Sequence, residues 1–366
     1  MKRATIVLPT YNEAKNITSV LEQIFSQKTP KWNVDVLVVD DNSPDGTGKI
    51  VAKLQKKYSK LHLLKGSKQG LGVAYTRGFD YVKKNMKADA LFEMDADLSH
   101  PPKLIPLFLK KIDEGADFVI GSRYVKGGGT PDFTLFRVLN SRVANLFARF
   151  VAGMHQVKDC TSGFRAIKMS VINKINFDTL DAKGYSFQQN LLYESLQQKI
   201  KVAEVPLIFY QRTEGESKMR TKDMIEFVQN SLKLGLRTWE RFLKFCLVGG
   251  TGVIVNTGIL FLLTTTFGIE YKISSIFAIQ IAIITNFILN NIWTFKKSTN
   301  ESHTLTKFFK FEGISLIGAL INWGILVGLT EFAGMYYLFS NLIGIIIATG
   351  WNYLMNVLFT WKNKKA

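Results

Sequence analysis

The sequence predicts an α/β domain with a mainly parallel sheet, followed by an all-α membrane domain of four helices. Three observations lead to this fold class. Over the first 125 residues, short apolar runs alternate with helical patterns, which is typical of strands buried in a parallel sheet. Residues 241–366 contain four long uncharged stretches, each long enough to span a bilayer as a helix. The length of 366 residues also suits two domains better than one.

The apolar runs define the elements of the α/β domain. The predicted strands lie at 4–8, 34–39, 61–64, 90–94, 118–120 and 202–210. Helices are predicted over 13–27 and near 186–197. Ligands of parallel sheets bind at the carboxyl ends of the strands. The residues that follow the first, second and fourth strands should therefore meet at one edge of the sheet.

Two carboxylates end the fourth predicted strand. Asp95 and Asp97 follow the apolar run 90–94, and side chains two positions apart along a strand point the same way. Such a pair can hold one divalent cation and leave its other positions to diphosphate oxygens. We predict Asp97 as the main ligand of Mg²⁺ or Mn²⁺, Asp95 as a metal or ribose contact, and Ser99 just outside the ligand set. The alternative is a helix-capping cluster, because the next residues open a helix.

The ends of the first two predicted strands carry further candidate residues. Pro9, Tyr11 and Glu13 follow the first strand, and Tyr11 offers a ring face to a base. Asp40 ends the second strand, where its carboxylate can accept hydrogen bonds from a base or a ribose. A plain turn explains the same residue, since segment 40–46 is rich in Asp, Asn, Ser and Gly. Both interpretations of Asp40 stay open.

The net charge of +18 favours anionic partners. The sequence shows no nucleic-acid-binding motif, so anionic lipid and phosphate substrates explain the charge better. In the C-terminal third, Lys272 is the only basic residue in a predicted loop on the side opposite the N-terminal domain. By the positive-inside rule, we expect a cell-membrane protein with both termini and the N-terminal domain in the cytoplasm. The two cysteines, Cys160 and Cys246, form neither a zinc spacing nor a disulfide framework.

The membrane domain is predicted from its uncharged stretches, which run over 245–269, 273–295, 313–330 and 332–361. Before them, residues 223–241 interleave apolar side chains with Lys and Arg. This pattern predicts an amphipathic helix on the membrane surface, and a helix packed on the α/β domain is the alternative. The expected division is an α/β domain at 1–222, interface helices or a linker at 223–241, and a membrane domain at 242–366.

The membrane domain contains an internal repeat at an offset of 66 residues. The matched residues are Lys244-Phe245 with Lys310-Phe311, Gly252 with Gly318, Asn256 with Asn322, Gly258 with Gly324, Tyr271 with Tyr337, Asn286-Phe287 with Asn352-Tyr353, and Thr294 with Thr360. Each copy is a two-helix hairpin, and copies with two spans keep the same orientation. Asn side chains in lipid need polar partners, so the matched Asn residues suggest contacts between helices. A role in lipid passage is the alternative.

The segments at the strand ends resemble those of glycosyltransferase family 2, which has the GT-A fold. The resemblance covers residues 1–230 and rests on Leu8-Pro9-Thr10-Tyr11-Asn12-Glu13, the segment 39–45, Gly70-Leu71-Gly72, the segment 95–102, and Gly121-Ser122-Arg123-Tyr124. Within the family, Asp-Ala-Asp-Leu-Ser-His-Pro-Pro is most similar to the dolichyl-phosphate mannose synthases. Residues 241–366 resemble the GtrA-like four-helix membrane domain, which is fused to the catalytic part in some of these enzymes.

The resemblance implies a role for each matching residue. The nucleotide and donor pocket is matched by Pro9, Tyr11, Glu13, Asp40 and Asp95. The metal and diphosphate site is matched by Asp95, Asp97 and Ser99. The acceptor-phosphate clamp is matched by Arg123, Arg137 and Ser141, and a basic segment that approaches the phosphates is matched by Arg212, Ser217 and Lys218. Converging guanidinium groups suit bidentate phosphate recognition, so Asp97, Arg123 and Arg137 are expected to carry the catalysis.

The resemblance implies transfer of mannose from GDP-mannose to dolichyl (polyprenyl) phosphate, with inversion and with Mg²⁺ or Mn²⁺ as cofactor. The bilayer is then a partner, and no obligate protein partner is inferred. A UDP-glucose-dependent transferase is one alternative, and a non-catalytic, flippase-like protein for lipid-linked sugars is another. A processive polysaccharide synthase fits less well, because the Gln-x-x-Arg-Trp signature of those enzymes is absent from the sequence.

One position departs from the family pattern. After Gly184 to Gln189, relatives commonly place Glu, whereas this chain has Asn190. A sugar hydroxyl acceptor would need a carboxylate base at such a site. A phosphate monoester has a second pKa near 6 and is largely dianionic at neutral pH, so it needs no strong base. The departure therefore fits a lipid-phosphate acceptor and leaves the role of this helix open.

Overall fold

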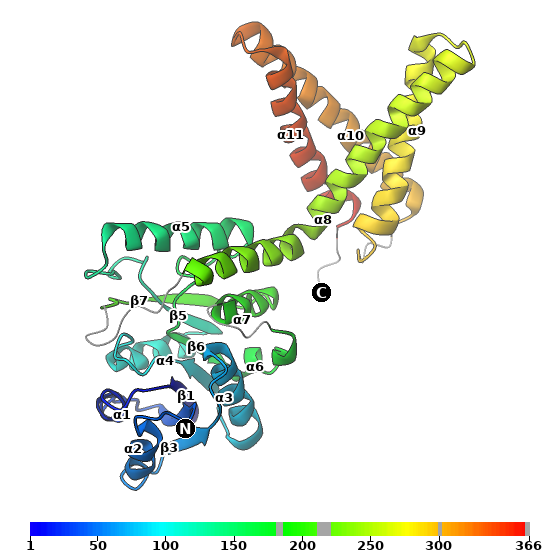
Figure 1. Cartoon of the computed structure of the whole chain (residues 1–366). Coiled ribbons are helices and arrows are strands. Elements are labelled where there is room, and N and C mark those ends of the chain that lie inside the picture. Colours follow the sequence, from blue (N-terminus) through cyan, green and yellow to red (C-terminus); the bar gives the residue numbers. More distant parts are fainter. Residues whose placement is uncertain (181–185, 211–220, 299–301, 363–366) are drawn as a thin grey trace. The chain divides into compact units, whose positions relative to one another are not determined.

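The structure is a computed structural model that describes residues 1–180, 186–210, 221–298 and 302–362. The chain divides into two compact units, Met1–Thr238 and Trp239–Ala366 (Figure 1). The predicted boundaries at residues 222 and 241 lie on either side of this division. Arg212, Ser217 and Lys218 lie outside the described residues, so their predicted role in the acceptor site stays a prediction.

In its described residues, the first unit has a seven-stranded sheet with the strand order β3-β2-β1-β4-β6-β5-β7. All neighbouring strands are parallel except β6, which runs antiparallel to both β4 and β5. The predicted mainly parallel sheet is therefore confirmed. The strands are β1 Lys2–Thr10, β2 Trp32–Asp40, β3 Leu61–Lys65, β4 Ala90–Glu93, β5 Phe118–Ser122, β6 Arg165–Lys168 and β7 Val202–Pro206.

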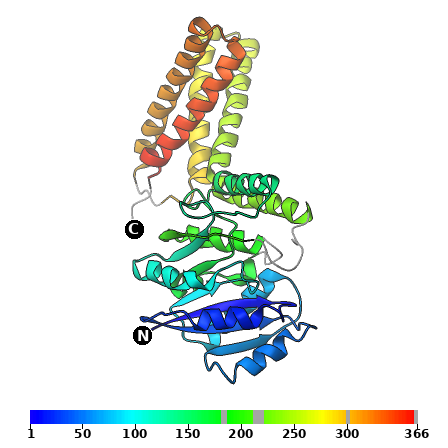
Figure 2. The ribbon, with the colours of Figure 1, turned by 90° about the vertical axis from the view of Figure 1, so that its left-hand side faces the viewer.

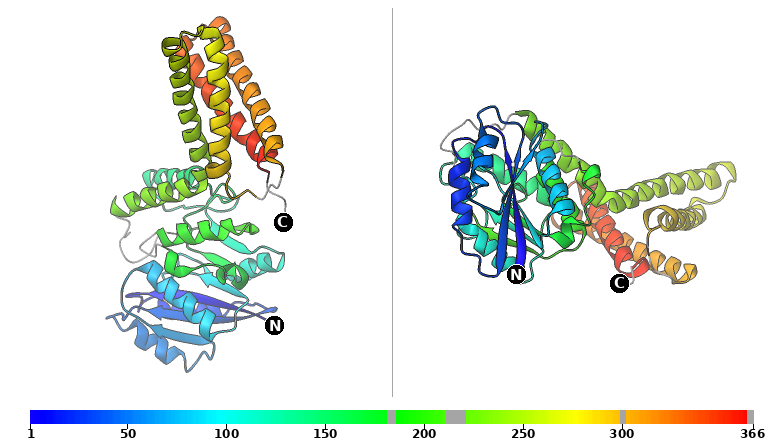
Figure 3. Two further views of the ribbon diagram at one scale, coloured as in Figure 1. Left: turned by 90° about the vertical axis from the view of Figure 1, so that its right-hand side faces the viewer. Right: turned by 90° about the horizontal axis from the view of Figure 1, so that it is seen from below.

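Helices cover both faces of this sheet, as Figure 2 and the right-hand view of Figure 3 show. One apolar cluster joins one face to α1, α2 and α4, and a second joins the other face to α3, α6 and α7. Consecutive strand residues enter opposite clusters, as Val7 and Leu8 do, so the strands are apolar throughout. The helices are α1 Ile17–Phe25, α2 Thr47–Leu54, α3 Leu71–Asn85, α4 Ile105–Asp113, α5 Leu135–Val151, α6 Met169–Ile172 and α7 Ser186–Gln197, with 3₁₀ turns η1 Pro102–Leu104 and η2 Phe177–Thr179.

Two predicted elements are shorter in the structure. The helix predicted from residue 13 begins at Ile17, because Asn12 takes a left-handed conformation with φ of 63° in the turn after β1. The strand predicted over 202–210 ends at Pro206. Within residues 207–210 the structure has an isolated bridge, between Gly129 and Ile208.

Among the residues that the structure describes, four helices are long and apolar enough to cross a membrane, at Met224–Thr266, Tyr271–Thr294, Thr304–Phe332 and Tyr337–Thr360. They comprise α8 Thr221–Phe261, α9 Tyr271–Leu289, α10 Thr304–Val327 and α11 Tyr337–Met355, each followed by a π-helical turn. The third span was predicted over 313–330, but its helix begins at Thr304. The charged and polar first turns of α10 concealed this start in the hydropathy pattern.

The second unit repeats the structure of one hairpin in the other. The π-helical turns at Leu262–Thr266 and Gly328–Phe332 are 66 residues apart, and those at Asn290–Thr294 and Asn356–Thr360 have the same offset. Two equivalent residues, Phe295 and Trp361, stack on each other with ring centroids 4.3 Å apart. The stack therefore joins equivalent positions of the two hairpins.

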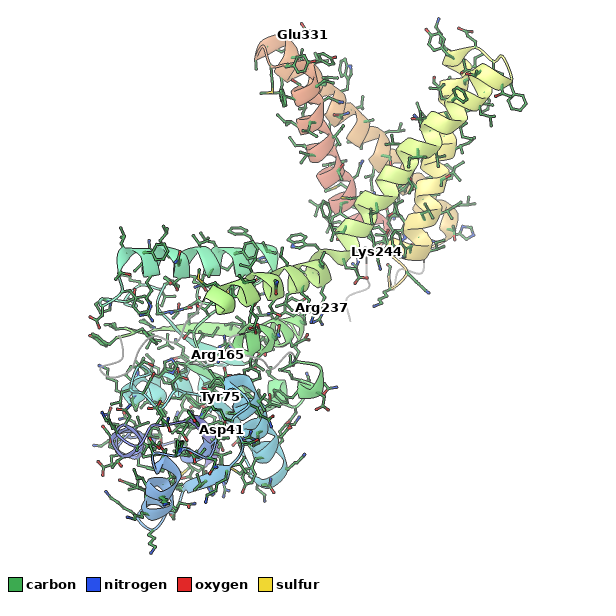
Figure 4. All side chains as sticks on the ribbon, in the orientation of Figure 1. Asp41, Tyr75, Arg165, Arg237, Lys244 and Glu331 are labelled. Atoms are coloured by element: carbon green, nitrogen blue, oxygen red, sulfur yellow. The ribbon has the colours of Figure 1, made fainter. Side chains whose placement is uncertain are left out.

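The matched Asn residues lie against glycines. A Cβ atom on Gly252 would come within 2.3 Å of the Asn286 amide, and one on Gly318 within 2.3 Å of the Asn352 amide. These contacts support the structural interpretation of the repeated Asn residues. Between the hairpins, the Gln280 amide donates a hydrogen bond to the Glu312 carboxylate, with an N–O distance of 2.8 Å. Lys244 and Glu331 lie at opposite ends of this unit (Figure 4).

Candidate active site

The candidate site of the first unit lies at the carboxyl edge of the sheet. Strand β1 pairs in parallel with β2 on one side and β4 on the other, and Thr10 lies beside Asp40 in this register. The residues that follow these strands therefore emerge at the same edge. This arrangement brings together the predicted residues Pro9, Tyr11, Glu13, Asp40, Asp95 and Asp97.

The acidic pair is held by a tight turn after β4. Leu98 has φ of 64°, a left-handed conformation that a bulky residue rarely adopts and that is common at functional sites. The turn brings the Ser99 backbone N–H and hydroxyl to one oxygen of Asp97, at 3.0 and 2.5 Å. The Asp95 backbone N–H donates to Nδ1 of the buried His100, at 2.9 Å. The loop thus fixes the carboxylate of Asp97 and the backbone of Asp95.

The donor set fits a hard divalent cation bound together with a diphosphate. Asp97 is 9% exposed, and the Asp95 side chain is 28% exposed. Among the described residues no cluster of three or more His, Cys, Asp or Glu side chains forms a complete protein cage. Two carboxylates are the usual protein contribution when phosphate and water supply the other oxygens, as Mg²⁺ prefers. Asp97 and Asp95 are the residues that would hold the ion.

A buried ionic layer lies beneath the acidic pair. Glu93, in β4, faces Arg165, in β6, at an N–O distance of 3.4 Å, and both side chains are fully buried. Burial raises the pKa of Glu93 to about 7, although the Arg165 charge acts in the opposite direction. The Arg165 guanidinium also donates to the carbonyl oxygens of Ser162, Gln188 and Cys160.

Tyr75, from α3, completes this layer, and Figure 4 shows Tyr75 and Arg165 in the interior of the first unit. The Tyr75 hydroxyl donates to Asp95 at 3.5 Å. Burial and then the neighbouring carboxylates of Asp95 and Glu93 raise the pKa of Tyr75. The hydroxyl therefore stays protonated and remains a donor to Asp95. Sequence reasoning missed these residues, and the one available signal was the charge of Glu93 inside an apolar strand.

Asp40 is occupied within its own turn. Its carboxylate accepts hydrogen bonds from the Thr10 hydroxyl at 3.1 Å and from the Ser43 hydroxyl at 2.6 Å. The Ser43 backbone N–H lies 3.2 Å from the second oxygen. The structure thus supports the turn interpretation of Asp40, while its contact with a base or ribose stays a prediction.

Tyr11 and Glu13 lie beside this turn with partners of their own. The Lys68 ammonium lies 3.5 Å from the centre of the Tyr11 ring, a cation–π contact that the sequence did not indicate. The Glu13 carboxylate accepts from the Asn16 amide at 3.0 Å. The loop of Lys68 is tied to the turn after β2 by Arg77, which donates to the Asp41 carboxylate and to the Ser67 carbonyl.

Arg123 follows β5 and is bound by a buried carboxylate. Its Nε and Nη2 atoms donate to the two oxygens of Asp159, both at 2.7 Å, and Nη2 also donates to the Thr161 hydroxyl. Burial alone would lower the pKa of Arg123, but the Asp159 charge outweighs it and raises that pKa. Burial likewise opposes ionisation of Asp159, and the Arg123 guanidinium lowers its pKa. Both groups are therefore charged at neutral pH.

The other two acceptor candidates lie one turn apart on α5. Arg137 and Ser141 are spaced i, i+4 and so share a helix face. The Ser141 hydroxyl accepts from the Tyr124 hydroxyl at 2.6 Å, which connects α5 to the segment of Arg123. The Arg137 guanidinium carbon lies 3.8 Å from the centre of the Phe133 ring. The structure therefore places Arg123 and Ser141 on neighbouring segments joined by Tyr124.

Asn190 lies in a helix contact of the first unit. Its side-chain oxygen accepts from the Asn230 amide at 3.0 Å, and the same amide donates to Gln189 at 2.7 Å. Asn190 is 6% exposed. Its carboxamide thus joins α7 to α8, which gives Asn190 a packing role.

Two adjacent helices of this unit expose apolar faces. Within it, Thr238 of α8 donates to the carbonyl of Ala152, at the end of α5, at 2.9 Å, and Gly235 packs against the Val151 backbone. We call the exposed apolar side chains of these helices the apolar platform. It comprises Leu135, Phe136, Leu139, Val143, Leu146 and Phe150 of α5 and Met224, Ile225, Val228, Leu232 and Leu236 of α8. An exposed apolar surface of this kind marks a site of contact with lipid or protein.

Comparisons with known proteins agree with this architecture. Residues 5–175 match the sequence profile of the family described as "Glycosyl transferase family 2". Residues 244–361 match the profile described as "GtrA/DPMS, transmembrane domain". The dolichol-phosphate mannosyltransferase of Pyrococcus furiosus is 35% identical over 367 residues, which cover 98% of this chain and 99% of that protein. The polyprenol monophosphomannose synthase of Mycolicibacterium smegmatis is 37% identical over 238 residues, which cover 64% of this chain and 88% of that protein.

Among solved structures, the mannosyl-3-phosphoglycerate synthase of Rubrobacter xylanophilus aligns with a TM-score of 0.47 and 20% identity, over 65% of this chain and 74% of that one. The full-length match to the Pyrococcus protein and the two profiles together settle the family. This chain belongs to glycosyltransferase family 2, and it is a multi-pass membrane glycosyltransferase with a GtrA/DPMS transmembrane domain.

Proposed function

We propose that this enzyme transfers mannose from GDP-mannose to a polyprenyl phosphate of the dolichyl type, with inversion and with the help of a divalent metal. The observation that carries the proposal is the match, over nearly the whole of both chains, to a dolichol-phosphate mannosyltransferase. The two carboxylates at the carboxyl edge and the arginines after β5 and on α5 supply the chemistry that such a transfer needs.

The acceptor needs charge neutralisation more than it needs a base. A phosphate monoester is largely dianionic at neutral pH, so its oxygen is already a nucleophile. Arg123 and Arg137 oppose its repulsion from the diphosphate of the donor. Asp159 binds Arg123 through Nε and Nη2, which leaves Nη1 to meet an anion. The Ser141 hydroxyl lies in the same region through its bond to Tyr124.

The donor side is assigned to Asp97, Asp95 and the nucleotide residues around Tyr11. Asp97 and Asp95 would hold a divalent ion there, and such an ion would supply neutralisation of the charge on the departing diphosphate. Ser99 keeps one Asp97 oxygen oriented through two hydrogen bonds. Attack of the phosphate oxygen on the anomeric carbon, on the face opposite the GDP, inverts its configuration and gives a β-linked mannosyl lipid.

The membrane arrangement follows from charge and burial. The bias of Lys and Arg toward one side of the four spans favours a cytoplasmic catalytic unit and cytoplasmic termini. The apolar platform and its basic neighbours, such as Arg237, which is half exposed, suit contact with the headgroup region. The catalytic edge then meets a phosphate that stays at the membrane surface while its isoprenoid tail stays in lipid.

The test is a donor comparison with the purified full chain. Radiolabelled GDP-mannose or UDP-glucose is supplied with polyprenyl phosphate and Mg²⁺ or Mn²⁺, and the labelled lipid is separated and its anomeric configuration determined. We expect a β-mannosyl lipid from GDP-mannose, and its loss on adding EDTA. A product only from UDP-glucose, or product formation that EDTA leaves unchanged, would contradict the sugar or the metal assignment respectively.

A further inference from the structure

One aromatic ring lies between the segments that we assign to the donor and to the acceptor. The Phe209 ring is 6.0 Å from the imidazole of His100 and 5.9 Å from the guanidinium carbon of Arg123. It also lies 5.8 Å from the ring of Phe133, which carries the Arg137 guanidinium at 3.8 Å. Phe209 thus contacts both the segment of the acidic pair and those of the two arginines.

The backbone holds this ring in place from both sides. After β7 ends, the Leu207 N–H donates to the Ser122 carbonyl at 2.9 Å, which continues the pairing with β5. Gly129 then donates to the Leu207 carbonyl and accepts from the Phe209 N–H, at 3.0 and 2.9 Å. In such an extended segment alternate residues share a face, so Phe209 points inward with the buried Leu207 while Ile208 is exposed.

The donor end of the contact is rigid as well. His100 is 2% exposed and stacks on Phe164, with ring centroids 5.1 Å apart. Its Nδ1 atom accepts from the Asp95 backbone N–H, so the imidazole is tied to the loop of the acidic pair. A ring that packs on His100 is therefore located relative to Asp95.

We propose that Phe209 is a positioning residue for the transfer, because its ring sets the distance of Arg123 and Arg137 from the loop of Asp95 and Asp97. This inference rests on the proposed function, in which the two arginines receive the lipid phosphate. A planar ring with two side-chain torsions is a stiff spacer, and its face attracts a guanidinium group. Two anions must be held within reacting distance, and a displacement of about 1 Å in such a site costs on the order of 100-fold in rate.

The test compares Phe209→Ala, Phe209→Leu and Phe209→Tyr with a matched control, Phe25→Ala. Phe25 is a half-buried aromatic residue that packs against the same apolar cluster, but it lies at the end of α1 and stacks on Tyr58. The full chain is assayed with GDP-mannose and polyprenyl phosphate, and KM for each substrate, kcat and the unfolding temperature are measured.

We expect kcat/KM for the lipid phosphate to fall on the order of 10- to 100-fold in Phe209→Ala and Phe209→Leu, with KM for GDP-mannose within about twofold of wild type. Phe209→Tyr keeps the ring and should restore the activity. Phe25→Ala should lower the unfolding temperature about as much as Phe209→Ala does, and it should leave kcat and both KM values unchanged.

Equal kinetics for Phe209→Ala and Phe25→Ala would overturn the inference and leave the proposed function intact, as would a loss confined to GDP-mannose. Normal activity of Phe209→Leu would overturn it in the same way. A wild-type enzyme that forms no mannosyl lipid would instead contradict the proposed function and the inference with it.

Discussion

The guanidinium of Arg165 lies 3.4 Å from the carboxylate of Glu93, and neither side chain is exposed to solvent. The pair joins the antiparallel strand β6 to β4. Its carboxylate belongs to Glu93, which lies two residues before Asp95 in the chain. Removing one partner of a buried pair leaves the other charge uncompensated. Three carbonyl oxygens accept hydrogen bonds from Arg165, whereas among the described residues no hydrogen bond reaches either oxygen of Glu93. The floor of the candidate site is therefore an ionic layer inside an apolar sheet.

Replacing Glu93 with Leu should strongly destabilise the first unit. The change leaves the Arg165 charge buried without its carboxylate, and breaking such a pair costs about 3–5 kcal/mol, which lowers an unfolding temperature by roughly 10 °C. The measurement is thermal unfolding of the full chain in detergent. The control is Glu22→Leu, which removes a pair with Lys57 whose side chains are half exposed, and it should have little effect. Equal shifts for both variants would show that the buried pair contributes no more than a surface pair.

Asp159→Asn should impair use of the lipid phosphate. The substitution removes the charge that orients Arg123 through two hydrogen bonds of 2.7 Å. We expect KM for polyprenyl phosphate to rise on the order of tenfold, and we expect little further loss when Asp159→Asn is added to Arg123→Ala. Steady-state kinetics of the single and double variants check this. Asp117→Asn, which breaks a partly exposed pair with Lys168, is the control. Additive losses in the double variant would mean that Asp159 acts independently of Arg123.

Charges on the apolar platform should weaken action on lipid in a membrane. Phe136 and Leu139 are 73% and 58% exposed on α5. Phe136→Asp with Leu139→Asp should lower kcat/KM for long-chain polyprenyl phosphate in vesicles by about 100-fold or more, because two large apolar side chains withdrawn from water are together worth at least about 3 kcal/mol. A short, water-soluble isoprenyl phosphate should be used as before. Lys57→Glu, a charge change on an exposed residue elsewhere, is the control. The same loss with both acceptors would argue against contact of the platform with lipid.

Gly252→Ala should destabilise the membrane unit. The added Cβ would come within 2.3 Å of the Asn286 amide, and overpacking of this kind costs about 1–3 kcal/mol. Gly249→Ala is the matched control, since a Cβ there would meet no atom within 4 Å. Thermal unfolding of both variants should separate them, and adding Asn286→Ala should relieve the effect of Gly252→Ala. Identical unfolding of the two glycine variants would contradict this helix contact.

Local sequence patterns were sufficient for every strand of the described sheet except β6, and for the edge at which the strands converge. The apolar runs locate β1, β2 and β4, and parallel pairing then brings Tyr11, Asp40 and Asp97 to one edge. The antiparallel strand β6 was not predictable, because Arg165–Lys168 is only four residues long and pairs with strands far away in the chain. The partner of Arg123, Asp159, depends on the same long-range pairing.

The platform on α5 could have been found from spacing. Residues 135, 136, 139, 143, 146 and 150 are apolar and recur every three or four positions, the pattern of an amphipathic helix. The role of Phe209 had no such signal, since its neighbours His100, Arg123 and Phe133 come from three separate segments. Contacts of this kind follow from the fold and are not encoded in a local pattern.

The claim that the acidic pair holds the sugar diphosphate is tested most directly at Asp97. The measurement is the initial rate of mannosyl-lipid formation by wild type and Asp97→Ala with saturating Mn²⁺, together with the affinity for Mn²⁺ in the presence of GDP by electron paramagnetic resonance. The account predicts a rate lower by about 1,000-fold or more and a loss of Mn²⁺ binding, while Asp113→Ala, at a carboxylate paired with Lys2, keeps both. A rate for Asp97→Ala close to that of wild type, with Mn²⁺ still bound, would contradict it.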